Sequence, residues 1–196
     1  MNQPDLLAAL APVVEAFDTL GVAYSIVGSV ASSAHGVARS TLDADLVVDL
    51  KADQVAGLVT QLEHDYYVDL DAARDAVSRR AMFNVIHLAT MVKVDIYVLT
   101  RREFDQTSFG RRTTRAMPDE PGARVFHLDT AEDTVLHKLE WYRAGGEVSD
   151  RQWSDITGVL QVQHDALDFA YLDRWAAELG VVDLLARARR DAGEPG

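Results

Sequence analysis

The chain has 196 residues, a net charge of −12 at pH 7, 48% hydrophobic residues and no cysteine. This length fits one domain, or one domain with a helical appendage, and the apolar content is sufficient for a core. The lack of cysteine excludes disulfides, thiolate metal sites and a cysteine nucleophile. No apolar run reaches the roughly 18 residues of a membrane span. We therefore expect a soluble cytoplasmic protein with no membrane partner, too acidic to coat nucleic acid non-specifically.

The first part of the chain alternates helical and strand patterns, and the last part is helical throughout. The patterns predict helices over residues 4–20, 29–35, 53–63 and 69–79, and strands over 23–27, 42–50, 82–88, 92–99 and 123–127. Four further helices are predicted over residues 131–144, 150–163, 168–179 and 181–190. Thr130 and Ser149 are suitable N-caps for two of them.

These elements predict an α+β fold, in which a small mixed β-sheet flanked by helices is followed by a C-terminal helical bundle. We predict an α/β core over residues 1–128 and a helical region over residues 129–196. The boundary is expected between Pro118 and Asp129, because Pro118, Pro121 and Gly122 interrupt the periodic pattern there.

Asp43 and Asp45 are two residues apart on a predicted strand, so their carboxylates project from one face while Leu42 and Leu46 face the core. Asp95 is an acid within a strongly strand-forming run, where acids are disfavoured. If the two strands are neighbours, the three carboxylates converge. Clustered carboxylates need a cation, and oxygen ligands of this kind suit Mg²⁺ or Mn²⁺. The sequence thus predicts a two-metal site for phosphoryl displacement.

Each acidic feature also has a simpler interpretation. A pair of aspartates two residues apart is common in solvated turns, and Asp95 taken alone fits a charge that protects an edge strand from aggregation. The combination of Gly28 and Ser29 after a strand, a paired acid on the next strand and a third acid on a later strand favours the catalytic interpretation.

Gly28 and Ser29 lie where a predicted strand ends and a short helix begins. Glycine allows the backbone to approach a ligand closely. The free N–H groups at the start of the helix suit a triphosphate, and the Ser29 hydroxyl adds a hydrogen-bond donor. We predict that this turn binds the phosphates of a nucleotide.

The glycine–serine turn, Asp43-Ala44-Asp45 and Asp95 together resemble the polymerase-beta-type nucleotidyltransferase superfamily. Within that superfamily, residues 36–45 (GVARSTLDAD) and residues 132–139 (EDTVLHKL) are similar to the abortive-infection, AbiEii-like toxin branch. The resemblance implies transfer of an NMP from an NTP such as ATP to an acceptor hydroxyl. It also implies nucleotide-binding roles for Arg39, Thr41 and Lys138.

For two of these residues the sequence leaves alternatives open. Lys138 is equally consistent with a surface lysine whose stem covers apolar neighbours. Arg39 either binds phosphate or pairs with a nearby aspartate.

The acceptor is left open by the sequence. A toxin-like enzyme would modify RNA, such as a tRNA end, through an arginine-rich segment and would leave room for a regulatory partner protein. That segment contains Arg101, Arg102, Arg111, Arg112, Arg115 and Arg124. An acidic surface also suits a polycationic small molecule such as an aminoglycoside, and nucleotidylation of a protein is a third option. A binding module with a degenerate transferase fold is the non-catalytic alternative.

Overall fold

The computed structural model describes residues 3–41, 43–117 and 123–193. Leu42, Pro118, Pro121 and Gly122, which the predictions above involve, lie outside the described residues. The chain divides into two compact units, each considered separately below. The sheet unit comprises Met1–Val27 and Ser40–Leu128, and the helical unit comprises Gly28–Arg39 and Asp129–Gly196. Residues 28–39 thus group with the C-terminal helices, whereas our division by chain order assigns them to the α/β part.

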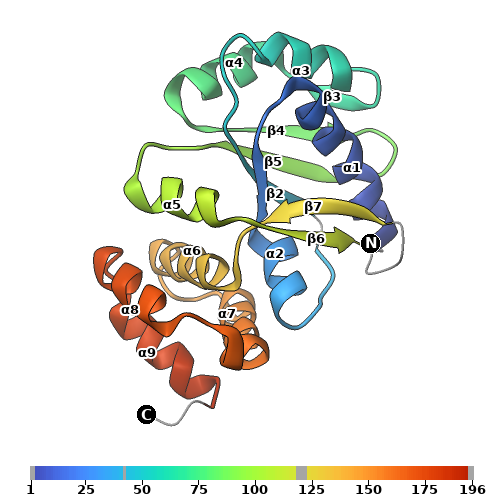
Figure 1. Cartoon of the computed structure of the whole chain (residues 1–196). Coiled ribbons are helices and arrows are strands. Elements are labelled where there is room, and N and C mark those ends of the chain that lie inside the picture. Colours follow the sequence, from blue (N-terminus) through green and yellow to red (C-terminus); the bar gives the residue numbers. More distant parts are fainter. Residues whose placement is uncertain (1–2, 42, 118–122, 194–196) are drawn as a thin grey trace. The chain divides into compact units, whose positions relative to one another are not determined.

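The sheet unit contains one mixed sheet with the strand order β3-β4-β5-β2-β1-β7-β6 (Figure 1). Its strands are β1 (Tyr24–Val27), β2 (Asp43–Val48), β3 (Tyr66–Val68), β4 (Met82–His87), β5 (Lys93–Val98), β6 (Thr113–Met117) and β7 (Arg124–Leu128). β2 pairs with β5, and β1 with β7, in parallel, whereas the other neighbours are antiparallel. The mixed sheet with flanking helices confirms the predicted fold class.

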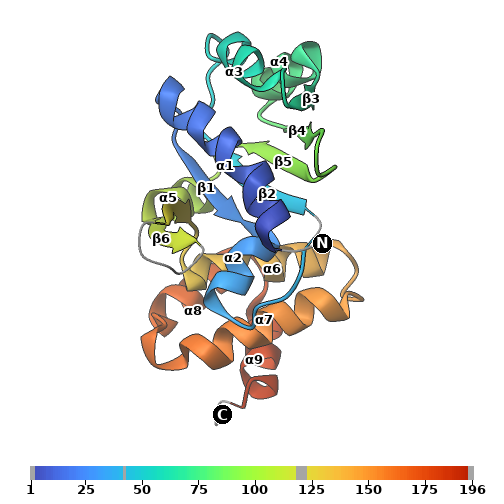
Figure 2. The same ribbon diagram turned by 90° about the vertical axis from the view of Figure 1, so that its right-hand side faces the viewer.

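The helices of this unit are α1 (Gln3–Leu20), α3 (Val55–Leu62), α4 (Leu70–Arg79) and α5 (Glu103–Arg111). α1 packs on β2, β5 and α3, and α4 packs on β4 (Figure 2). In β2 the exposure alternates, with Ala44, Leu46 and Val48 buried and the residues between them half-buried. Burial of such apolar side chains contributes about 1.5–3 kcal/mol each, so this alternation decides which face of the sheet enters the core.

The helical unit contains α2 (Gly28–His35), α6 (Ala131–Ala144), α7 (Asp150–Gln163), a short 3₁₀ turn (His164–Ala166), α8 (Phe169–Glu178) and α9 (Val182–Asp191). Thr130 and Ser149 accept hydrogen bonds from the backbone N–H groups of Asp133 and Gln152, which confirms both predicted N-caps. α2 packs against α6 and α7. None of the helices in the described ranges has both the length and the apolar content that crossing a bilayer requires.

Four elements were not expected from the sequence: β3, α5, β6 and the 3₁₀ turn His164–Ala166. β3 has three residues, too few to show a period. β6 is an edge strand whose side chains are exposed or half-buried, so it has no apolar face. In α5, only Phe104, Ser108 and Phe109 are buried, and the surrounding charged residues obscure that narrow stripe.

Gly36 follows α2, where the backbones of α2 and α7 approach closely. A Cβ atom there would lie 2.9 Å from the backbone nitrogen of Val159 and 3.0 Å from the carbonyl carbon of Gly158. Because neither backbone atom can move without displacing α7, we predict that Gly36→Ala lowers the free energy of unfolding by about 1–3 kcal/mol. Urea denaturation followed by circular dichroism measures this change.

The matched control is Gly110→Ala within α5, where a Cβ atom meets nothing within 4 Å. Alanine is the better helix former by up to about 1 kcal/mol, so this control should be neutral or stabilising. An equal loss of stability in both variants would show that close packing at Gly36 is not the cause.

Candidate functional site

The three predicted carboxylates lie on one face of the sheet unit. In the parallel pairing of β2 with β5, Asp45 is directly opposite Asp95, and Asp43 is opposite Lys93. Neighbouring strands are about 4.8 Å apart, and paired residues in a ladder share a face. The expectation that these strands are neighbours is therefore confirmed. We call Asp43, Asp45 and Asp95 the acidic face.

The strand register extends this face to β4. Asn84 is opposite Asp95 on the other side of β5, with Met82 opposite Tyr97 and Ile86 opposite Lys93. Asn84 and Met82 are exposed and Ile86 is half-buried. The acidic face is therefore bordered by an amide flanked by two apolar side chains.

Asp95 is the most buried member of the acidic face, with 5% of its surface exposed. One of its oxygens, Oδ2, lies 2.7 Å from the Nζ atom of Lys93, which precedes it by two residues on the same strand. The other oxygen, Oδ1, is buried and has no hydrogen-bond partner. A buried carboxylate oxygen without a partner costs free energy, and such an atom is expected where a ligand is to bind.

Two neighbouring groups respond to the combined charge of the acidic face. Burial, followed by the charges of Asp45, Asp95 and Asp43, raises the pKa of Tyr97 to about 12. The hydrogen bond to Asp95 raises the pKa of Lys93, and the charges of all three carboxylates add to this against the opposing effect of burial. All three carboxylates thus act on the same small region.

Thr41 lies just before β2 and orients the first carboxylate. Its hydroxyl oxygen is 3.0 Å from Oδ1 and 3.1 Å from the backbone oxygen of Asp43. In this structure Thr41 therefore positions Asp43, and the nucleotide-binding role implied for it stays a prediction.

The acidic face fits a hard divalent cation by its chemistry. It offers carboxylate oxygens, the ligands that Mg²⁺ and Mn²⁺ prefer, and Oδ1 of Asp95 lacks a partner. As the side chains lie, however, no group of three or more His, Cys, Asp or Glu residues in the described ranges is arranged to hold a metal ion. A metal ion held by three of these side chains would therefore require them to reorient, whereas one that arrives with phosphates needs only one or two carboxylates.

In the helical unit, Gly28 begins α2 directly after Val27, the residue that pairs with Asp45. Gly28 has a φ of 63°, a left-handed conformation that favours glycine. The Ser29 hydroxyl accepts a hydrogen bond of 2.7 Å from Nη2 of Arg39. Since a hydroxyl has one hydrogen of its own, Ser29 can still donate to a ligand.

Arg39 is also held by Asp155 in a bidentate ion pair. Its Nε and Nη2 atoms each lie 2.7 Å from a carboxylate oxygen of Asp155. Nζ of Lys138 lies 2.8 Å from Oδ2 of the same carboxylate. We call these three residues and Ser29 the Asp155 network. Burial acts to raise the pKa of Asp155, but the hydrogen bonds from Arg39 and Lys138 outweigh it and hold that pKa below its usual range.

This network decides between the alternatives left open for two residues. Lys138 is 3% exposed, so the interpretation as a surface lysine is wrong. Arg39 pairs with an aspartate, and that aspartate is Asp155. A phosphate-binding role of either residue stays a prediction.

Other residues of the 132–139 segment stabilise the helical unit. Glu132 accepts a hydrogen bond from the backbone N–H of Asp168, next to the start of α8. Asp133 is fully buried and accepts hydrogen bonds from the hydroxyls of Thr130 and Tyr171. The acidic residues of this segment thus join α6 to α8.

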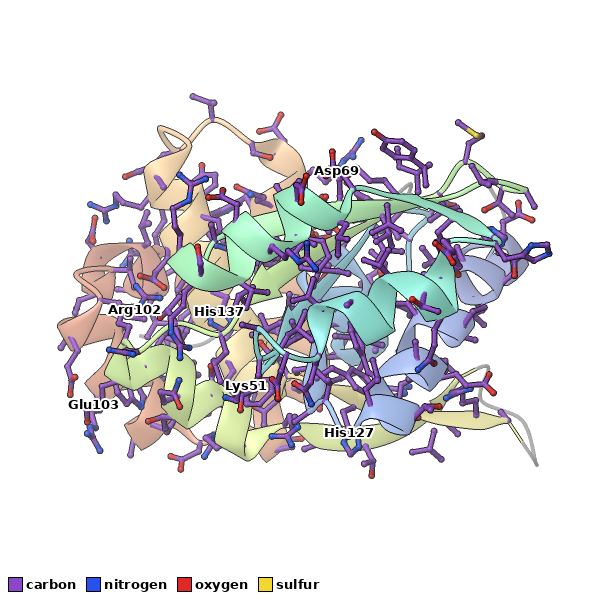
Figure 3. All side chains as sticks on the ribbon, turned by 90° about the horizontal axis from the view of Figure 1, so that it is seen from above. Lys51, Asp69, Arg102, Glu103, His127 and His137 are labelled. Atoms are coloured by element: carbon purple, nitrogen blue, oxygen red, sulfur yellow. The ribbon has the colours of Figure 1, made fainter. Side chains whose placement is uncertain are left out.

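Several arginines of the 101–124 segment are engaged within the sheet unit. Arg102 precedes Glu103 at the beginning of α5 (Figure 3) and pairs with Asp105 at 2.6 Å. Arg124 pairs with Asp18 at 2.9 Å, and the Arg112 guanidinium lies 4.4 Å from the centre of the Phe109 ring. These pairings reduce the positive charge that the segment presents to an anionic partner.

No protein-family model and no curated protein matches the chain in sequence. The fold is that of nucleotidyltransferases. The chain is similar to an antigenic nucleotidyltransferase-like protein from Paracoccidioides brasiliensis, with a TM-score of 0.61 and 18% identity, covering 94% of this chain and 89% of that one.

Two further similar structures are antibiotic-modifying or resistance proteins. One is the lincosamide antibiotic adenylyltransferase LnuA with lincomycin bound, with a TM-score of 0.53, 14% identity and coverage of 83% and 98% of the two chains. The other is the antibiotic-resistance factor ANT(2'')-Ia, with a TM-score of 0.53, 14% identity and coverage of 95% and 93%. These similarities show the fold alone, and the resemblance to the AbiEii-like branch stays a prediction.

The structure adds Lys93 and Asn84 to the candidate set and gives a role to Asp155, a residue that the resemblance to the AbiEii-like branch already included but that was not predicted as a site residue. The alternation within residues 91–99 already places Lys93 on the same face as Asp95. Asn84 requires the register between β4 and β5, which the sequence does not contain. Asp155 requires the packing of α7 in the helical unit.

We predict that Asp155→Asn lowers the free energy of unfolding by about 3–5 kcal/mol at neutral pH, because Lys138 is left as an unpaired buried charge. The pKa of Asp155 is lowered in the folded state, so its contribution is present above the unfolded value of 3.8 and is lost as pH falls through the folded pKa. The difference in stability between wild type and variant should therefore be full at pH 6 and shrink below about pH 4. Urea denaturation across this pH range measures it.

The control for this prediction is Glu178→Gln, which removes an exposed ion pair with Arg174 on α8. Exposed pairs contribute about 0–1 kcal/mol, so this variant should remain close to wild type. A stability difference for Asp155→Asn that did not depend on pH would contradict an ionic role of the carboxylate.

Proposed function

We propose that this protein is a metal-dependent nucleotidyltransferase that transfers an NMP from an NTP to an acceptor hydroxyl and releases pyrophosphate. The strand register carries this proposal. It places Asp45 opposite Asp95, and Asp43 lies two residues before Asp45 on the same strand. The similarity in fold to adenylyltransferases supports it.

Asp43, Asp45 and Asp95 are the residues that would hold Mg²⁺ or Mn²⁺. When bound, the cation would neutralise phosphate charge and orient the reacting oxygens. Within the helical unit, Ser29 would donate its hydroxyl hydrogen to a phosphate group, and the N–H groups at the start of α2 would add further donors. Arg39 and Lys138 act on this turn through the Asp155 network, since Arg39 holds the Ser29 oxygen.

Asp95 is the residue proposed to accept the proton. The acceptor oxygen forms a bond to the α-phosphorus, the bond between that phosphorus and the bridging oxygen to the β-phosphorus breaks, and pyrophosphate leaves. The proton of the acceptor hydroxyl passes to a carboxylate oxygen of Asp95, and Oδ1 is the oxygen without a hydrogen-bond partner. Positioning and charge neutralisation supply most of the acceleration in transfers of this kind.

We predict that Asp45→Asn and Asp95→Asn each reduce NMP transfer by at least about a hundredfold, because each removes a carboxylate that would hold the metal ion. The measurement is incubation with α-labelled NTPs, Mg²⁺ and a cell extract, followed by identification of the labelled species. Isothermal titration with Mg²⁺ and ATP tests nucleotide binding in parallel.

The matched control is Asp49→Asn, since Asp49 directly follows β2, the strand that carries Asp45, but pairs with Lys51. This variant should keep wild-type activity. Metal-dependent ATP binding that survives unchanged in the Asp43→Asn and Asp45→Asn double variant would refute the proposal and favour a non-catalytic binding module.

For the acceptor we propose a small cationic molecule that carries a hydroxyl group. The net charge of −12 attracts cations, and Arg102 and Arg124 are already paired with acids. Lincomycin is bound to one structure of similar fold. RNA modification, protein nucleotidylation and a regulatory partner protein remain predictions from the sequence.

We predict that label from α-labelled ATP enters lincomycin or an aminoglycoside, and not total RNA, when the three are offered together. Separation of small molecules from RNA by size, followed by counting, measures the result. Label in RNA, with a yield that falls steeply between about 50 and 200 mM salt, would instead indicate a phosphate-contacting RNA site.

A further inference from the structure

Lys93 is the one cationic side chain among the residues that the pairing of β2, β5 and β4 places beside the acidic face. These paired residues are Asp43, Asp45, Val47, Lys93, Asp95, Tyr97, Met82, Asn84 and Ile86. The Lys93 side chain is 44% exposed, yet its ammonium group reaches Asp95, whose side chain is 7% exposed. Lys93 thus extends from the solvent side to a buried carboxylate.

The position of this ammonium group has an electrostatic reason. Three carboxylates on adjacent strands repel one another unless a cation lies among them. Lys93 is opposite Asp43 in the register between β2 and β5, and its ammonium group forms an ion pair with Asp95. It therefore contacts one carboxylate of the acidic face and lies beside a second one.

The same arrangement bears on metal binding. Oδ2 of Asp95 is occupied by Nζ of Lys93 at 2.7 Å, and the acids as they lie form no group able to hold a metal ion. The ammonium group keeps Oδ2 from being a full ligand of a second cation. Oδ1 has no partner, so at that oxygen the ammonium group opposes a second cation by its charge.

We propose that Lys93 is the resident counter-ion of the acidic face and competes with the divalent cation for Asp95. The proposal rests on the metal-binding role proposed above. A metal that arrives with a nucleotide brings phosphates, and these offer the displaced ammonium group a new anionic partner. Metal binding is therefore weak without nucleotide and strong with it.

The test measures Mn²⁺ binding without nucleotide, from the electron paramagnetic resonance signal of free Mn²⁺. Lys93→Met removes the charge and keeps most of the stem, and Lys93→Gln removes the charge but keeps a donor for Asp95. Both variants should bind Mn²⁺ roughly tenfold more tightly than wild type, within the usual range of coupling between sites. Without metal they should unfold at lower temperature than wild type, and Mn²⁺ should raise that temperature more than it does for wild type.

The matched control is Lys51→Met, which changes net charge equally and removes a lysine paired with an aspartate two residues away, Asp49. Its Mn²⁺ affinity should equal that of wild type. An equal gain in Lys51→Met would show a general charge effect and would overturn the competition.

The remaining outcomes separate the two proposals. If the Lys93 variants bind Mn²⁺ no more tightly than wild type, while wild-type binding is lost in Asp45→Asn, the role of Lys93 is wrong and the metal site stands. If neither wild type nor any variant binds Mn²⁺, with or without ATP, the proposed metal-dependent function is refuted, and this inference is refuted with it. If both Lys93 variants fail to fold even with Mn²⁺, Lys93 is required by the fold and competition is overturned.

Discussion

The parallel pairing of β2 with β5 is the interaction on which the candidate site depends. Each strand carries an apolar face, with Leu46 on β2 and Ile96 on β5 fully buried and paired in the same register that places Asp45 opposite Asp95. A slip by one residue would turn the carboxylates into the core and the apolar side chains out. The packing that stabilises the sheet therefore also determines where the charges lie.

The period of two in a strand explains why part of this site could be predicted from the sequence. Asp43 and Asp45 share a face by spacing alone, whereas Asp95 needed the added assumption that its strand is a neighbour. Residues that depend on a partner strand or helix, such as Asn84 opposite Asp95, could not be predicted, because register and packing are absent from local pattern. β3 and β6 were missed for the related reason that short or exposed strands show no periodicity.

Charge is the property for which local sequence was least informative. Arg124 looks like part of a basic segment, yet its partner Asp18 lies on α1, far away in the chain. Lysine is a residue type usually found at the surface, yet Lys138 is buried because Asp155 on α7 completes its ion pair. In both cases a distant acid decides whether a cation is available to a ligand, so counting charges along the chain overestimates the anion-binding surface.

The acidic face and the Asp155 network, each within its own unit, share one property: each buried charge has an oppositely charged partner. A buried charge is tolerated when it has a partner, so a site for a charged ligand needs a substitute partner until the ligand binds. Asp155 is the partner of Lys138 and Arg39, and Lys93 is the partner of Asp95. Under the metal-binding role proposed above, binding would exchange one partner of Asp95 for another, and the free energy gained would be the difference between the two pairings. Such a site would favour a ligand that replaces the lost partner as well as fills the site, and the proposed nucleotide with its metal ion would meet both conditions.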